Sequence, residues 1–157
     1  MRALIPLFAL LVALPAAAID VSGWEANSEQ EQIALELLKK DKVHEGWDIL
    51  EKLHEEGDVS ATFNLGNLYM MGAEEHGLAK APKKGFNMIL EAAQQRHPDA
   101  LYIVGMQAAQ TGQIKQAMQY MSAAAELGSG PALYWIGGFH KQRGNMEQAV
   151  DYLTRAI

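Results

Sequence analysis

The sequence predicts an all-α protein, an α-solenoid of about four antiparallel helical hairpins. Three observations predict this fold. The 157 residues are 49% hydrophobic and 20% charged, which suits one globular domain and argues against disorder. Small and aromatic residues recur in the same order at spacings of 32 and 39 residues, as in helical repeats. Prolines and glycines punctuate each unit at helix-length intervals. A hairpin of this kind cannot bury its apolar face alone, so stacked hairpins must form the core.

Residues 1–18, MRALIPLFALLVALPAAA, are predicted to be a signal peptide. A basic start at Arg2 is followed by an apolar run over 3–14, a proline and small residues up to Ala18. A membrane anchor is the alternative, but the run is shorter than the roughly 20 residues of a spanning helix. We therefore expect cleavage after Ala18 and a mature chain that is periplasmic or secreted, with no stable membrane anchor.

The remaining chain divides into a short linker and a repeat domain. We expect the amino-terminal linker at 19–27 and the repeats at 28–157. The predicted units run over about 28–58, 59–97, 98–129 and 130–157. The predicted helices are 28–40, 43–56, 59–71, 81–96, 98–110, 113–127, 130–142 and 145–156.

The register of the repeats supports these boundaries. A shift of 32 residues brings Tyr102 onto Tyr134 and Gly105 onto Gly137, and a shift of 39 brings Phe63 onto Tyr102. The first unit is more degenerate. Its similarity to the second lies in its second helix, where Gly46, Trp47, Leu50 and Leu53 correspond to Gly85, Phe86, Ile89 and Ala92.

Small residues at fixed positions have a physical role in this arrangement. A glycine in the middle of each later first helix lets the two backbones of a hairpin approach closely: Gly66, Gly105 and Gly137. Glycines one helix length later tolerate a positive φ and end the helix: Gly112 and Gly144. Prolines stand where a missing amide hydrogen costs nothing, at the helix starts: Pro98 and Pro131.

The strings ATFNLGNLYMMG and AAAELGSGPALYWIG resemble the Sel1-like repeat family, which is related to the tetratricopeptide repeats. The opening pattern is matched by Ala61, Leu65, Gly66, Tyr69 and Gly72, and the closing pattern by Ala92, Ala93, Ala124, Ala125 and Gly128. Two departures are Gly85, where alanine is usual, and Arg96, which replaces the closing glycine. The resemblance implies a right-handed superhelix that binds proteins on the concave side, which its first helices line.

Motifs for catalysis or metal binding are weak. The chain has no cysteine, which excludes a cysteine nucleophile and cysteine-ligated zinc. Its five histidines show no metal-binding spacing, and Glu74, Glu75 and His76 are better explained as a polar loop than as a cation site. We interpret His140 as packing within its hairpin, and Ser129 or Gly130 as the cap of the next helix. No metal and no cofactor is predicted, and a net charge of -6 argues against nucleic acid.

A protein-binding groove is the main candidate site. By analogy with the family, it is expected on the first helices, where aromatic, thioether and amide groups suit a protein segment. Periodicity alone does not separate a groove position from a core position for the aromatic members. The candidate residues are Phe63, Asn67, Met70, Tyr102, Met106, Gln110, Tyr134 and Lys141.

The carboxyl-terminal edge and the charge distribution suggest further contacts. We expect Val150, Leu153 and Ile157 to form an apolar edge that a second copy or a partner covers. Residues 19–75 carry 14 acidic and 4 basic side chains, whereas residues 76–157 carry 5 acidic and 8 basic ones. This polarity suits a basic partner surface or head-to-tail self-association, although solubility alone also explains it.

Three functions are compatible with these features. The favoured one is an exported, non-catalytic interaction module or adaptor that binds a segment of an unidentified protein partner. The alternative is an inhibitor or immunity protein that caps an exported toxin or hydrolase. A hydrolase is the remote alternative, because no activated nucleophile is evident in the sequence.

Overall fold

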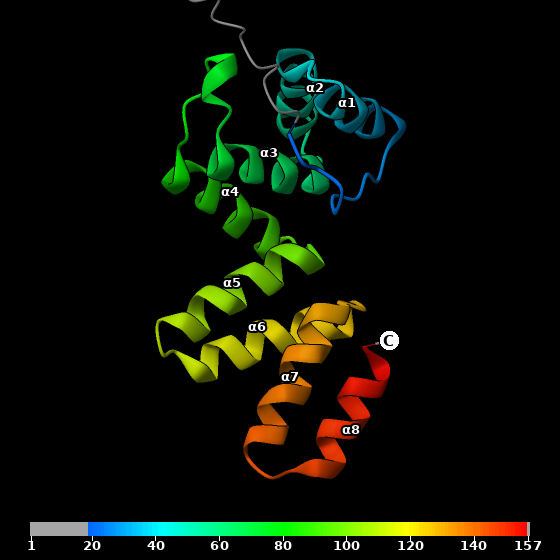
Figure 1. Ribbon diagram of the computed structural model, residues 1–157, viewed down its shortest axis with the longest axis vertical. Helices are drawn as coiled ribbons and strands as arrows, with labels where there is room; N and C mark the ends of the chain where they lie inside the picture. The colour runs from blue at the N-terminus through cyan, green and yellow to red at the C-terminus, as the bar shows by residue number, and fades with distance from the viewer. Residues whose placement is uncertain (1–18, 157) are drawn as a thin grey trace, which may run out of the picture.

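The computed structural model describes residues 19–156 and folds them into eight α-helices, packed as four consecutive hairpins (Figure 1). Each helix lies within two residues of its predicted bounds, so the predicted fold class is confirmed. The helices are α1 (Glu29–Lys39), α2 (Val43–Glu55), α3 (Val59–Met71), α4 (Pro82–Gln94), α5 (Pro98–Gln110), α6 (Ile114–Glu126), α7 (Gly130–Gln142) and α8 (Met146–Arg155). A short 3-10 helix, η1 (Glu74–His76), lies in the loop between α3 and α4.

Two sequence predictions lie outside the described residues. These are the signal peptide, residues 1–18, and the contribution of Ile157 to the carboxyl-terminal edge. Within residues 19–156, none of the helices combines the length and the hydropathy that crossing a membrane requires.

The first helix of every hairpin begins with a side-chain cap. Ser28, Asp58, His97 and Ser129 each accept a hydrogen bond from the backbone N–H three residues further on. Such a cap satisfies one of the amide groups left without a partner at a helix start. The second helices α2, α4, α6 and α8 have no side-chain cap. A capping side chain therefore fixes the residue at which each first helix begins. The starting residue in turn decides which side chains lie on each face of that helix.

The turns follow the predicted glycine pattern except at two places, Asp41 in the turn after α1, with φ 63°, and Arg96 after α4. Gly112 and Gly144 have φ angles of 76° and 78°, as expected for residues that end a first helix. Arg96 adopts the same left-handed conformation, with φ 65°, where the repeat pattern has a glycine. A side chain in this conformation costs about 1 kcal/mol, so this turn is held by the packing around it.

The helices of a hairpin cross where their backbones nearly touch. A Cβ atom added to Gly85 would lie 2.5 Å from the carbonyl oxygen of Gly66, and one added to Gly66 would lie 3.0 Å from that of Gly85. A Cβ atom added to Gly46 would lie 2.7 Å from the carbonyl oxygen of Ala34, and one added to Gly137 would lie 2.7 Å from the Cγ atom of Leu153. Glycine is required at such a crossing because any side chain would push the helices apart.

The apolar core forms two clusters that meet at the second hairpin. One cluster joins α1, α2 and α3 through residues such as Leu38, Leu50 and Leu65. The other runs through α4 to α7 and includes Ile89 and Met121. Each hairpin therefore completes its core against a neighbour, as expected for a solenoid.

Residues 19–27, predicted as a linker, contain no helix but are not detached from the fold. Ile19 and Val21 are buried in the first core cluster, Val21 with only 1% of its surface exposed. The side chain of Trp24 packs against the same cluster. The segment runs beside α1 and α3 in an irregular conformation (Figure 1, blue).

We expect Gly85→Ala to lower the free energy of unfolding by about 1–3 kcal/mol, because the added methyl group overpacks the crossing of α3 and α4. Gly138 on α7 is the matched control, since a Cβ added there meets nothing within 4 Å. Gly138→Ala should raise stability by about 0.5–1 kcal/mol through the better helix propensity of alanine. Urea unfolding followed by circular dichroism measures both. Equal effects of the two substitutions would contradict this account of the crossing.

His97 should make stability depend on pH. Its Nδ1 accepts the capping hydrogen bond from Ala100 at 3.4 Å, and its ring stacks on Phe63 with the centroids 4.4 Å apart. Burial lowers the pKa of His97 below the usual 6.5, although nearby carboxylates, Asp99 first, oppose this. Just below pH 6.5 the unfolded chain therefore binds more protons than the folded one, so stability falls as the pH decreases.

The test compares the wild-type chain with His97→Asn, which retains a capping oxygen but does not titrate. Between pH 7 and pH 5.5, the free energy of unfolding should fall less in the variant than in the wild type. Parallel curves for the two proteins would show that His97 does not contribute to the pH dependence.

Candidate protein-binding groove

An apolar hollow lies between the first helices of the last two hairpins, α5 and α7. Its volume is about 340 Å³, and none of its lining residues is acidic. The lining residues are Tyr102, Met106, Pro131, Tyr134, Trp135, Gly138, Phe139 and Gln142. We call this hollow the α5–α7 groove.

Three of the predicted groove residues come together in this groove. Tyr102 and Met106 are half-buried on α5, and Tyr134 on α7 has 69% of its surface exposed. Tyr134 is therefore a large aromatic side chain with little packing of its own. Exposed aromatic groups beside a hollow are typical of surfaces that bind protein segments.

The aromatic character of the groove also depends on two residues that the predicted set omits. Trp135 and Phe139 are stacked on α7, with their ring centroids 5.6 Å apart and an interplanar angle of 13°. The guanidinium of Arg143 lies 4.3 Å from the centre of the Phe139 ring. The spacing of the two aromatic residues, four positions apart on one helix, is the signal that identifies them.

Phe63 does not line the groove. It is only 7% exposed and stacks on the imidazole of His97, so its ring belongs to the core. Its repeat equivalents Tyr102 and Tyr134 are less covered. The ring of His97, which caps the following first helix, covers Phe63. Ser129 is the equivalent cap after Tyr102, and no further first helix follows Tyr134 within residues 19–156.

The other predicted groove residues lie apart from this hollow. Asn67 is half-buried on α3, and Met70 lines a separate hollow of about 420 Å³ with Pro82 and Phe86. Gln110 and Lys141 are exposed near the ends of α5 and α7. The predicted set is thus divided among the core, two hollows and the open surface.

The predicted carboxyl-terminal edge is partly packed within its own hairpin. Leu153 is half-buried and faces Gly137, where an added Cβ would lie 2.7 Å from the leucine Cγ. Val150 has 59% of its surface exposed. His140 also packs within this hairpin, as predicted, with its ring parallel to that of Tyr152 at 5.6 Å.

The first half of the repeat array holds the chain's own amino-terminal segment. On α3, the side chains of Asn64 and Ser60 donate hydrogen bonds to the backbone carbonyl of Glu25 at 3.2 and 3.4 Å. On α1, the carboxylate of Glu31 accepts hydrogen bonds from the backbone N–H of Asn27 at 2.7 Å and from Asn64 Nδ2 at 2.6 Å. Glu31 is completely buried. The segment is therefore fixed by polar contacts to two first helices.

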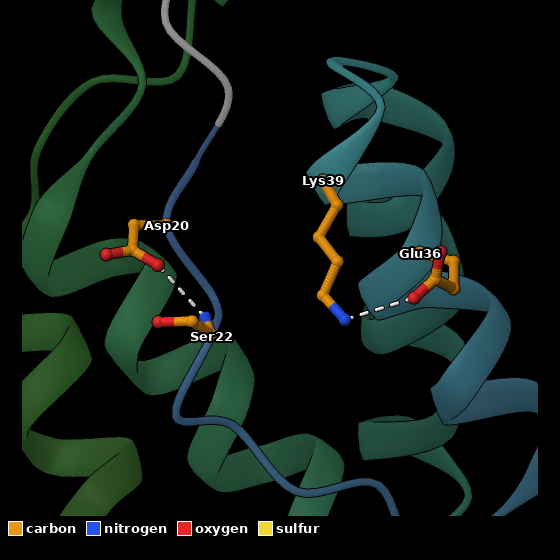
Figure 2. A network of polar contacts seen from close by, with 4 residues as sticks. All are labelled: Asp20, Ser22, Glu36 and Lys39. Atoms are coloured by element: carbon orange, nitrogen blue, oxygen red, sulfur yellow. Dashed lines mark hydrogen bonds and ion pairs between the residues drawn. The ribbon is translucent and has the colours of Figure 1, made fainter.

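Two other polar contacts, one in this segment and one on α1, are exposed to solvent. Figure 2 shows Asp20 of the segment accepting a hydrogen bond from the backbone N–H of Ser22 at 3.0 Å. Hydrogen bonding from the Ser22 side chain, and then from its backbone, lowers the pKa of Asp20. On α1, the hydrogen bond from Lys39 to Glu36 at 3.0 Å lowers the pKa of Glu36 in the same way.

A polar cluster between α2, α3 and α4 has a structural role. The hydroxyl of Tyr69 donates to Glu51 at 3.2 Å, and Lys84 contacts that hydroxyl while its Nζ lies 3.8 Å from the ring centre. The Tyr69 ring also meets Trp47 edge-on at 4.6 Å. These contacts join three helices through one tyrosine.

The loop that contains Glu74 and Glu75 is tied to the first hairpin. Nε2 of His76 lies 3.0 Å from Oδ1 of Asp41, in the turn between α1 and α2. Among residues 19–156, no three His, Asp or Glu side chains converge in a way that would hold a metal ion.

Comparison with known proteins relates this fold to helical-repeat proteins. The family model "Tetratricopeptide repeat" matches residues 130–157. No curated protein matches the chain. The Sel1 repeat protein from Oxalobacter formigenes is 27% identical, with a TM-score of 0.69 over 81% of this chain and 56% of that one.

Two further solved structures share the fold at lower identity. The protein c5321, a protective antigen of uropathogenic Escherichia coli strains with an SLR fold, is 21% identical with a TM-score of 0.63 over 81% of this chain. The immunity protein Pa5087 from Pseudomonas aeruginosa is 20% identical with a TM-score of 0.52, over 89% of this chain and 70% of that one.

The chain spans about half the length of the Oxalobacter protein and 29% of c5321. The similarity therefore covers the repeats and only part of each of those two proteins. The resemblance seen in the sequence is confirmed, and the fold of this chain is that of the Sel1-like and tetratricopeptide helical-repeat proteins.

Proposed function

We propose that this chain is an exported, non-catalytic protein-interaction module that holds a segment of a partner protein in the α5–α7 groove. The observation that carries the proposal is the exposure of Tyr134 beside Tyr102, Trp135 and Phe139 in one hollow. Repeat folds of this type are generally interaction scaffolds. Export is proposed from the leader-like residues 1–18.

The chemistry of the groove suits a protein segment better than a small polar substrate. Aromatic side chains give a large contact area at a low entropic cost, because each has only two rotatable side-chain bonds. Met106 adapts its shape to different apolar groups. The lining offers hydrogen-bond donors from Gln142 and Trp135 but contains no carboxylate or histidine to act as a general base.

A second candidate is an inhibitor that caps an exported enzyme with a basic surface. The acidic side chains of residues 19–75 outnumber the basic ones by 14 to 4, which favours such a partner. A solved protein with this fold is an immunity protein, and that similarity concerns the fold alone. An inhibitor would bind its enzyme through the acidic first hairpin, and the complex would weaken as salt increases.

Site-specific photocrosslinking in the native host tests the groove proposal. Tyr134 is replaced by p-benzoylphenylalanine, which keeps an exposed aromatic ring at the mouth of the groove. We expect a crosslinked partner protein after irradiation of the full-length chain, and loss of that product when Gly138→Trp fills the groove. Gly138→Ala should retain the product, because it adds only one methyl group in open space.

The control places the same photoreactive residue at Lys52 on α2, an exposed position far along the chain from the groove. A product that appears only from Lys52 and weakens with salt would favour the inhibitor. A product from Tyr134 that persists in Gly138→Trp would show that the partner does not occupy the groove.

A further inference from the structure

The way in which the chain holds residues 19–27 indicates what the α5–α7 groove binds. We propose that this groove takes an extended segment of a partner protein in which an aromatic side chain stands next to an acidic one. The inference rests on the proposed function and specifies the chemistry of the partner. Its first support is the equivalence of the two halves of the array.

The amino-terminal segment and the groove use the same face of the first helices. Ser60 and Asn64, which hold the carbonyl of Glu25, are equivalent in the repeat register to Pro131 and Trp135. Pro131 and Trp135 line the α5–α7 groove. The positions that hold a backbone carbonyl of the amino-terminal segment in the first half of the array thus line the groove in the second half.

The residue types at these positions differ between the two halves. Asn64 and Ser60 offer an amide and a hydroxyl, which bind a backbone carbonyl directly. In the second half, Trp135 offers one indole N–H and a large apolar surface. An occupant of the α5–α7 groove therefore gains mostly from burying a side chain, and an aromatic ring fits beside Tyr102 and Phe139 in a hollow of about 340 Å³.

The charge around the groove favours an acidic neighbour for that ring. Arg143 follows Gln142 at the end of the groove, and its guanidinium lies against the Phe139 ring. Lys141 is exposed in the last turn of α7. Neither cation forms an ion pair within residues 19–156. Asp99 carries the only carboxylate on α5 and α7, and it lies in the first turn of α5.

The chain's own segment has the same chemistry. In the sequence IDVSGWEAN, residues 19–27, Trp24 directly precedes Glu25. The ring of Trp24 packs on the first core cluster, while the side chain of Glu25 is exposed and its carbonyl is held by α3. The molecule thus contains an irregular segment with adjacent aromatic and acidic residues that lies on its first helices.

Selection from a random library tests the inference without knowledge of the partner. A twelve-residue random peptide library displayed on phage is panned on the immobilised chain, residues 19–157. We expect the recovered peptides to share an aromatic residue with Asp or Glu beside it. A synthetic consensus peptide should bind about tenfold more weakly to Gly138→Trp and to Lys141→Glu/Arg143→Glu than to the wild type. Gly138→Ala should bind like the wild type.

The outcomes separate the inference from the proposed function. Peptides that require an open groove but carry no acidic residue, or that bind equally to Lys141→Glu/Arg143→Glu, would overturn the inference and leave the groove proposal standing. Absence of any peptide sensitive to Gly138→Trp would overturn both. Because Lys141 and Arg143 are exposed, their substitution tests charge even if Gly138→Trp fails to fold.

Another occupant is a second copy of this chain. Two results together would show this: the peptide IDVSGWEAN binds the groove as tightly as the selected consensus, and the full chain forms dimers in sedimentation that Gly138→Trp abolishes. The occupant of the groove would then be a second copy and not a partner protein, and the inference would be overturned.

Discussion

The close approach of paired helices is the constraint on which the rest of this structure depends. At the crossing of α3 and α4, the backbone oxygen of Gly66 occupies the space that a side chain on Gly85 would need. The two core clusters meet at this hairpin. A wider crossing would therefore separate the halves of the array as well as the two helices. The repeated hairpins also place the first helices in equivalent positions along the array.

The face of the first helices is a set of equivalent positions with different chemistry. A capped start fixes the register of each first helix, so that Asn64 and Trp135 occupy the same place in their repeats. The first position binds a backbone carbonyl, whereas the second presents an indole ring to a hollow. One scaffold thus provides a polar surface that is already occupied and an aromatic surface that is open. The few side chains that differ change the chemistry of the face without changing the fold.

The sequence predicts the helices well because their ends have local causes. Glycine, proline and capping residues mark each boundary, and these effects need no tertiary information. The site is less predictable because it depends on contacts between repeats. Phe63 and Tyr134 share one register, yet His97 covers the first, whereas the second is mostly exposed. Residues 19–27 have no periodic pattern that would indicate the burial of Val21. The stacking of Trp135 on Phe139, by contrast, can be predicted from the sequence, because the two residues are four positions apart on one helix.

The first half of the array holds its segment with polar groups, whereas the α5–α7 groove is aromatic. The free-energy cost of ordering a bound segment accounts for this difference. Fixing the backbone costs about 1–2 kcal/mol per residue, and a tethered segment loses less freedom than a separate one because it cannot diffuse away. Residues 19–27 offset this cost with buried Ile19 and Val21 and with hydrogen bonds to α1 and α3. A separate partner must also lose its free translation and rotation on binding. It therefore needs a stronger anchor per residue, and a ring buried among Tyr102, Trp135 and Phe139 supplies more apolar contact than any amide or hydroxyl at those positions.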